Sequence, residues 1–366
     1  MPKAVATGGT NPDRLSDLPD EVLHFILSCV DSESAVRSGI LSNRWRSLWK
    51  TVPVLNFDGE SFNDDGQSFK RHVDRFLYLR STTLHEVRRI SVLNCPGFDE
   101  RSDVLTALFL SISRCGPSLE TLNLQTVRLY TMAFAVPCSV FKVLTTLTLV
   151  DCCFDFSCWY QQGDPFAGFP ALKNLKLISC SCCLDDEDDP DDDGKCLEVY
   201  GPELLSLEIH APFGFDQIEV SAPKLESFTY RVVIPDFSPV IQVYLDVPSL
   251  QHADIMLWGY ADLDYEYAKE EANEQFSDML LCLGGVETLS LQFDTLEALI
   301  NACGLMKNQP SPFTRLKSLK LLYSEGNVGI PRDVMHFFVD GSPFMDENAV
   351  KLTKVATSSF PYNLRA

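Results

Sequence analysis

The sequence predicts an α/β protein in which a short N-terminal helical module precedes a long, irregular solenoid built on a parallel β-sheet. Two observations support this prediction. Residues 14–53 show three short amphipathic helical patterns, and ten copies of a strand-like hexamer follow between residues 52 and 321. The chain has 366 residues, 45% of them hydrophobic, which is enough for a core of this size.

The composition narrows the range of partners and compartments. A net charge of −21 disfavours binding to nucleic acid or to an anionic membrane, because both attract clusters of Lys and Arg. The N-terminal stretch has no apolar signal core, and no apolar run approaches the ~20 residues of a membrane-spanning helix. Thirteen cysteines and the absence of an Asn-x-Ser/Thr acceptor favour a reducing compartment with free thiols. We therefore expect a protein of the cytoplasm, the nucleus or both.

The first predicted helix begins close to Pro19. Proline suits a first helical turn, where no N–H is needed, and Asp20 and Glu21 complement the helix dipole. A single apolar stripe with the spacing i, i+3, i+4 and i+7 follows, and it consists of Leu23, Ile26, Leu27 and Val30.

Two further helices complete the module of residues 14–53. The second carries Val36 and Ile40, and Ser32 or Ser34 is expected to cap it. Ser42 is expected to cap the third, whose apolar stripe consists of Trp45, Leu48, Trp49 and Val52. Either both tryptophans fill a local core, or one of them anchors another protein. Because a module of this length buries little surface alone, we expect it to pack on the rest of the chain or on a partner.

The remainder of the chain repeats the pattern apolar-x-x-apolar-x-apolar. The ten hexamers start 21 to 36 residues apart and are VPVLNF (52–57), VRRISV (87–92), LETLNL (119–124), LTTLTL (144–149), LKNLKL (172–177), LLSLEI (204–209), LESFTY (225–230), LQHADI (250–255), VETLSL (286–291) and LKSLKL (316–321). Leucine-rich repeats share this pattern with periods of ~20–29 residues, so the array is irregular and carries insertions. Each hexamer predicts a strand with its aliphatic side chains inward. Covering helices are expected between some strands, as at 102–112 and 294–306.

Two motifs of the N-terminal module point to a known family. LPDEVLHFIL (18–27) and LSNRWRSLWK (41–50) resemble the F-box of plant F-box proteins in order, spacing and aromatic type. The resemblance implies docking on the Skp-type adaptor of an SCF ubiquitin ligase and, through the adaptor, on its cullin. It implies that Trp49 packs inward against the following domain and that the adaptor-facing residues are Leu18, Pro19, Ile26, Leu27, Leu41, Ser42 and Trp45. One departure is CVDSES (29–34), where family members often carry a Leu-Pro turn.

Over residues 14 to about 323 the chain resembles plant F-box/leucine-rich-repeat proteins. The resemblance implies a disordered N-terminus (1–13), an F-box (14–53), repeats (54–323) and a C-terminal cap or tail (324–366). Many family members end in a further domain rich in Trp and Pro, whose signature is not evident in this last segment. The acidic run at 185–194 is expected to be a disordered insertion in the repeats, because blocks of like charge repel and stay solvated.

No catalytic residue, metal site or cofactor is predicted. Cys95, Cys152 and Cys180 each fall three residues after the last aliphatic of a hexamer, a slot where the side chain turns inward as a small hydrophobe. The segment 189–200 mimics a calcium loop, but Tyr200 stands where the loop needs a bidentate Glu. We find no nucleophile elbow, phosphate-binding loop or paired-His zinc motif. An enzyme is therefore disfavoured.

The residues between the repeat aliphatics are expected to face a concave surface that binds a protein substrate. The charged or ionisable members of this set are Lys176, Glu208, His210, Arg231, His252, Asp254 and Lys320. The set is close to neutral, with three basic and two acidic side chains, so the acidity of the chain is expected at 185–193, at 262–274 and near the N-terminus. Together these features favour a substrate-recognition subunit of an SCF-type E3 ubiquitin ligase. The alternative is a leucine-rich-repeat scaffold that binds proteins without a ligase.

Overall fold

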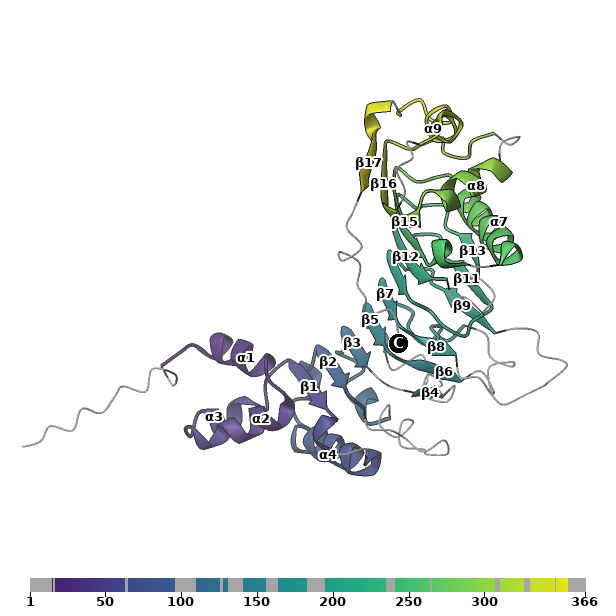
Figure 1. Ribbon diagram of the computed structural model, residues 1–366. Helices are drawn as coiled ribbons and strands as arrows, with labels where there is room; N and C mark the ends of the chain where they lie inside the picture. The colour runs from purple at the N-terminus through teal and green to yellow at the C-terminus, as the bar shows by residue number, and fades with distance from the viewer. Residues whose placement is uncertain are drawn as a thin grey trace, which may run out of the picture.

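The computed structural model describes residues 15, 17–62, 65–95, 110–125, 128–130, 141–155, 164–182, 195–234, 241–263, 265–306, 310–325, 330–345 and 347–354. Within these residues, short helices lie at one end of a bent, eleven-stranded parallel sheet (Figure 1). Two three-stranded parallel sheets and several longer helices cover the outer side of the bend, which leaves the inner face of the main sheet open (Figure 1). This architecture confirms the predicted α/β class with its parallel repeat sheet.

The main sheet follows the predicted repeats. Its strands, in spatial order, are β1 (Val54–Asp58), β2 (Arg89–Leu93), β3 (Thr121–Gln125), β5 (Thr146–Val150), β7 (Asn174–Ile178), β10 (Ser206–His210), β12 (Ser227–Val233), β14 (His252–Trp258), β15 (Thr288–Thr295), β16 (Ser318–Glu325) and β17 (Val350–Lys354). Each of the first ten strands begins two residues after the start of one predicted hexamer. The eleventh strand lies in the segment predicted as a cap or tail, so the sheet continues into that segment.

The covering layer differs from the prediction in the middle of the array. Helices cover the two ends, namely α4 (Gly66–Leu79), α7 (Glu266–Cys282), α8 (Glu297–Leu305) and α9 (Arg332–Val339). Between them the chain returns through short strands, namely β4 (Arg128–Tyr130), β6 (Cys153–Asp155), β8 (Ser181–Cys182), β9 (Cys196–Tyr200), β11 (Gln217–Ser221) and β13 (Gln242–Asp246). Short 3-10 turns occur at η2 (Glu60–Phe62), η3 (Leu84–Glu86), η5 (Tyr260–Asp262) and η6 (Glu347–Ala349).

The reason for these return strands is the length and pattern of the connections. Only 21 residues separate the starts of β10 and β12, and the stretch Gln217–Ser221 between them alternates apolar and polar side chains. That alternation has the period of a strand, and its apolar side is buried against the core. The helix predicted at 294–306 is confirmed as α8, whereas the one predicted at 102–112 lies mostly outside the described residues, as do 1–13 and 185–194.

The N-terminal module contains α1 (Asp20–Ser28), α2 (Ser32–Arg37), the 3-10 turn η1 (Ser38–Ile40) and α3 (Trp45–Leu48). The predicted caps Ser32 and Ser34 are wrong, because the Asp31 side chain caps α2 by accepting a hydrogen bond from the Ser34 N–H at 2.8 Å. Arg44 stands at the N-cap position of α3 without a side-chain cap, so the predicted Ser42 cap is wrong, although the Ser42 Oγ accepts a hydrogen bond from the Trp45 N–H at 3.4 Å.

The module is joined to the sheet by an aromatic contact. Trp49 is buried and its ring lies 5.2 Å from that of Phe76 on α4, which confirms that this tryptophan packs inward against the following domain. Beside it, the Asn56 side chain on β1 donates to the carbonyls of Ser28 and Val30 at 2.9 and 3.0 Å. The turn between α1 and α2 is thereby tied to the first strand.

A buried arginine lies at the same junction. Arg80 follows α4 and is fully buried, and its Nη2 donates to the Val52 carbonyl at 2.8 Å. Burial lowers the pKa of Arg80 to about 10. In the part of the chain that the structure describes, the Nε and Nη1 atoms of Arg80 have no hydrogen-bond partner, so burying this side chain is costly.

Several repeat strands end in the same turn. Asn94, Asp151, Ser179 and Ala211 follow β2, β5, β7 and β10, and their φ angles are 47°, 50°, 48° and 46°. A left-handed residue at this point turns the next side chain into the core. The residues that follow Asn94, Asp151 and Ser179 are Cys95, Cys152 and Cys180, and all three are buried as predicted.

The buried thiols bridge neighbouring repeats. Cys152 Sγ donates to the Leu124 carbonyl at 3.7 Å and Cys180 Sγ donates to the Leu149 carbonyl at 3.6 Å. Burial raises the pKa of Cys95 to about 12, so this thiol stays protonated. Cys153, which follows Cys152 in the sequence, is disulfide-bonded, and this departs from the expectation of free thiols.

The left-handed turns predict a contrast between two alanines. In a left-handed conformation Ala costs roughly 1–2 kcal/mol, which Ala211→Gly would relieve. Because Gly also raises the conformational entropy of the unfolded chain, the free energy of unfolding should stay unchanged or rise by about 0.5 kcal/mol. Ala253 lies in the interior of β14, where the same change should lower stability by roughly 0.5–1 kcal/mol. Urea denaturation of both variants measures the difference. Equal losses at the two positions would contradict a strained turn at Ala211.

Candidate functional site

The N-terminal module exposes an unusual amount of apolar surface. Phe25 is 70% exposed and Ile40 is 90% exposed. The other large exposed apolar side chains of the module are Leu15, Val22, Val30, Val36 and Leu41. Exposed apolar surface of this kind, concentrated on about 40 residues, is typical of a protein-interaction site. We call these seven side chains the module surface.

The predicted adaptor-facing residues divide between the module surface and the core. Pro19 and Leu41 are exposed, and Leu18, Ile26 and Ser42 are half-buried. Leu27 and Trp45 are each only 3% exposed and pack in the core of the chain. The reason is helical spacing, because Leu27 shares a face of α1 with buried Leu23, and Trp45 begins a stripe that is buried throughout. Leu27 and Trp45 therefore support the module surface from beneath.

Sequence reasoning missed the outer face of α1. Val22 and Phe25 follow the spacing i, i+3 on a face of the helix turned away from Leu23 and Leu27, and half-buried Ile26 lies between the two faces. A helix that is apolar on two faces must bury both, and the fold of this chain covers only one of them. The second apolar face of α1 therefore indicates, already in the sequence, a surface suited to protein binding.

The inner face of the main sheet brings the predicted repeat residues together in rows. Parallel register places one polar side chain of each strand beside its neighbour, and the first row is Thr121, Thr146, Asn174, Ser206, Ser227, His252, Thr288 and Ser318. The second row is Asn123, Thr148, Lys176, Glu208, Thr229, Asp254, Ser290 and Lys320. All of these side chains are half-buried or exposed. Ser206, Ser227 and Thr288 join the predicted set.

The charges on this face pair with one another. Lys176 Nζ lies 2.5 Å from Glu208 Oε2, and Arg231 Nη2 lies 2.8 Å from Asp254 Oδ2. Burial and the nearby Arg231 guanidinium lower the pKa of His210, whose Nε2 lies 3.8 Å from Glu208. The centre of the face is thus a mixed, internally neutralised surface.

A groove crosses the later strands of the same face. It has a volume of about 300 Å³, and its polar lining includes Ser227, His252, Asp254, Thr288, Ser290 and Lys320. His252 Nδ1 lies 2.6 Å from Thr288 Oγ1. The hydroxyl groups and the imidazole of this lining can exchange hydrogen bonds with a bound chain.

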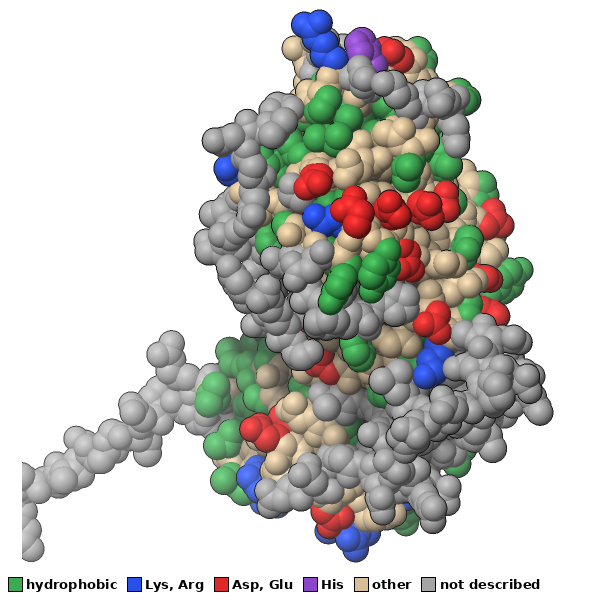
Figure 2. Space-filling model, turned by 45° about the vertical axis from the view of Figure 1, so that its right-hand side comes forward, with side chains coloured by type: hydrophobic (Ala, Val, Ile, Leu, Met, Phe, Trp, Pro, Cys, Tyr) green, Lys and Arg blue, Asp and Glu red, His purple; other side chains and the backbone are tan. Residues whose placement is uncertain are grey.

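The acidic segment 262–274 contributes to α7 on the outer side. Glu266, Glu270 and Glu274 on this helix are exposed, and Figure 2 shows a row of acidic side chains across the face that carries α7. These acidic side chains of α7 therefore lie away from the rows of the inner face.

The described residues include no group of three or more His, Cys, Asp or Glu side chains placed to hold a metal ion. Burial raises the pKa of Cys115 to about 11 and that of Cys303 to about 12, which disfavours the reactive thiolate. In the part of the chain that the structure describes, no helix is long and apolar enough to cross a membrane.

Comparison with known proteins agrees with this geometry. The F-box domain family matches residues 15–57. In Arabidopsis thaliana, the F-box/FBD/LRR-repeat protein At2g04230 is 27% identical over 240 residues, which cover 63% of this chain and 50% of that protein. The putative F-box/FBD/LRR-repeat protein At4g03220 is 26% identical over 358 residues, or 84% of this chain and 68% of that protein.

A third relative from the same plant has a higher sequence identity. The putative F-box/FBD/LRR-repeat protein At5g44950 is 43% identical over 274 residues, or 64% of this chain and 58% of that protein. The chain thus spans about half to two thirds of the length of these relatives. The chain thus carries an F-box domain at residues 15–57 with a parallel repeat sheet behind it, and it is similar to plant F-box/FBD/LRR-repeat proteins.

Proposed function

We propose that this chain is the non-catalytic substrate-recognition subunit of an SCF-type E3 ubiquitin ligase. Its F-box binds a Skp-type adaptor, which connects it to a cullin, and its repeats bind a protein substrate. The observation that carries the proposal is the module surface, with Phe25 and Ile40 at its most exposed points. The chain would contribute proximity, because it raises the effective concentration of substrate lysines near the charged ubiquitin carrier.

The packing beneath the module surface suits a docking site. Leu27 and Trp45 fill the core directly under it, so the exposed side chains stand on a rigid support. When a partner docks, this chain then loses little conformational freedom, which favours affinity. Trp49 and Asn56 hold the module against the sheet, so a substrate on the repeats would keep a defined position relative to the adaptor.

The module surface also bears on the alternative function. A repeat scaffold without a ligase would use the N-terminal helices only as a cap of the array. Caps of repeat proteins present a polar outer face to water. The exposed Phe25, Ile40 and Leu41 are the opposite of such a face, and they favour the adaptor-binding function.

Adaptor docking predicts a clear effect of surface substitutions. The double variant Phe25→Ser, Ile40→Ser should weaken binding of the Skp-type adaptor at least ~30-fold, because truncating a central anchor costs about 2 kcal/mol or more. Its melting temperature should stay close to that of the wild type, since both side chains face water. Calorimetric titration with purified adaptor measures the affinity.

Two further variants serve as controls. Tyr78→Ser removes an exposed aromatic ring from α4, outside the module, and should bind like the wild type. Trp45→Ala should lose adaptor binding together with stability, because truncating a buried Trp costs about 3–5 kcal/mol. Wild-type affinity of the Phe25, Ile40 double variant would refute docking through the module surface.

The inner face predicts a second effect, on substrate capture. The double variant Arg231→Ala, His252→Ala removes the ion-pair partner of Asp254 and a polar group from the groove, so it should capture less substrate while binding the adaptor normally. The measurement is affinity purification from cells treated with a proteasome inhibitor. Neutralising Glu266, Glu270 and Glu274 on α7 is the control. If the Arg231, His252 variant captured substrate normally and the α7 variant did not, substrate recognition would lie on α7 instead.

A further inference from the structure

The end of the inner face farthest from the N-terminal module carries a pair of lysines. Lys320 on β16 and Lys351 on β17 are register partners in the parallel pairing of these two strands. Register partners project from the same face of a sheet, so Lys351 extends the second row of the inner face beyond Lys320. Both side chains are exposed, and their strands lie at the end of the sheet opposite to α1 and α3 (Figure 1).

The positive charge of this lysine pair is not compensated within the described part of the chain. Neither Lys320 nor Lys351 has an ion-pair partner there. The nearest carboxylate of the second row, that of Asp254, already accepts hydrogen bonds from Arg231 Nη2 at 2.8 Å and from Gln292 Nε2 at 3.2 Å. Like charges directly opposite each other on neighbouring strands destabilise a sheet. The chain keeps such a pair although its net charge is −21.

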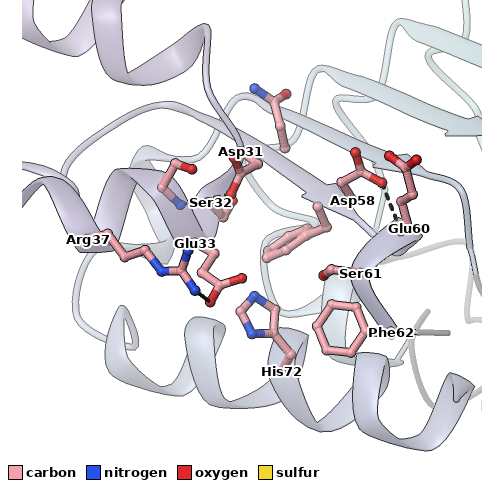
Figure 3. Close-up of a pocket in the computed structure, with 12 residues that line it drawn as sticks. Asp31, Ser32, Glu33, Arg37, Asp58, Glu60, Ser61, Phe62 and His72 are labelled. Carbon is pink, nitrogen blue, oxygen red and sulfur yellow. Dashed lines mark hydrogen bonds and ion pairs between the residues drawn. The ribbon is translucent and has the colours of Figure 1, made fainter.

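Other cations in hollows of this molecule are neutralised internally. At the centre of the inner face, the basic side chains form the ion pairs with Glu208 and Asp254 described above. In the pocket between α2, β1, η2 and α4, Arg37 Nη2 lies 2.6 Å from Glu33 Oε1 (Figure 3). The lysine pair differs from these cations, so the matching negative charge can come from outside the chain.

The groove of the inner face leads to the lysine pair. Lys320 lines this groove together with Ser290 and Ser318. Ser290 is the register partner of Lys320 on β15, and the hydroxyl groups of both serines have no hydrogen-bond partner among the described residues. A short hydroxyl side chain lets a bound main chain approach the sheet, and it can both donate to and accept from that chain. The groove therefore suits an extended chain segment that ends at the lysines.

Two features favour carboxylates over a phosphate as the partner of the lysines. Phosphate sites often use converging backbone N–H groups, but β16 lies between β15 and β17, so its N–H groups are engaged in the sheet. The lysines also stand on separate strands about 4.8 Å apart and have long flexible stems, so each can meet a charge of its own. In an extended chain, side chains two residues apart point the same way at a spacing of about 7 Å. Two acidic side chains at i and i+2 match this arrangement.

We propose that the β16–β17 end of the inner face binds an extended substrate segment that carries two acidic side chains with one residue between them. The inference rests on the proposed role of the repeats in substrate binding, and it names the chemistry of that substrate. Lys320 and Lys351 pair with the two carboxylates, while Ser290 and Ser318 exchange hydrogen bonds with the main chain of the segment. Opposite charge at one end of the groove also fixes the direction in which the segment lies.

The test uses the full chain and three fluorescent peptide libraries. The libraries share flanks randomised among uncharged residues and differ in a fixed central triplet, which is Glu-Ala-Glu, Gln-Ala-Gln or Ala-phosphoserine-Ala. Fluorescence anisotropy measures their affinities at low and high salt. At low salt we expect the Glu-Ala-Glu library to bind about tenfold more tightly than the Gln-Ala-Gln library, and we expect high salt to reduce this preference because it screens exposed charges.

Two charge-matched double variants locate the preference on the protein. Lys320→Gln, Lys351→Gln should abolish it, and the melting temperature should stay level or rise because two opposed like charges are removed. Lys142→Gln, Lys173→Gln is the control and should keep the preference of the wild type. These two lysines are also exposed and have no ion-pair partner among the described residues, but they precede β5 and β7 and do not lie on the rows.

Three results would overturn the proposal. They are equal affinities of the wild type for the Glu-Ala-Glu and Gln-Ala-Gln libraries, equal effects of the two double variants on the preference, and binding of the phosphoserine library alone. The last result would assign the lysines to a phosphorylated residue. Failure of the proposed ligase function is separate, because it appears as wild-type adaptor affinity of the Phe25, Ile40 double variant, a measurement that involves none of these peptides.

Discussion

The contact between Trp49 and Phe76 connects the two parts of the molecule, and the arrangement of the rest depends on it. Its rings bury the C-terminal end of the helical module against α4, while Asn56 ties the turn between α1 and α2 to β1. A module of about 40 residues rarely folds alone, so the first repeat supplies the missing core. The same contact sets the direction in which the sheet leaves the module. One patch of packing therefore supports the fold of the F-box and fixes its orientation to the repeats.

The repeat strands were predictable because their signal is local. Alternating aliphatic residues specify a strand and its buried face within six positions, and every predicted hexamer became a strand of the main sheet. The burial of Cys95, Cys152 and Cys180 was predictable for the same reason. The return strands of the middle repeats were not, because Gln217–Ser221 alternates like the hexamers but lacks their leucine spacing.

The candidate sites show the limit of such reasoning more sharply. Helical spacing identified Trp45 and Leu27, but the motif alone could not say which side of the helix faces the core, and both proved buried. The rows of the inner face followed from strand alternation. Their ion pairs did not, because Lys176 and Glu208 become neighbours only through the register between β7 and β10. Residues of α2, β1, η2 and α4 come together around a pocket at the junction of the module and the sheet, and no local pattern brings these segments together.

The parallel register of the sheet has a consequence for how such a repeat protein can change over evolutionary time. Each strand places its first polar residue beside that of its neighbour, although the connections between strands differ widely in length. The connections can therefore gain or lose residues without shifting the alignment of the rows. Single outward positions can also be replaced without disturbing the aliphatic layer beneath them. The surface behaves as a grid of independently variable positions, so related repeat proteins can diverge in this surface while keeping one scaffold.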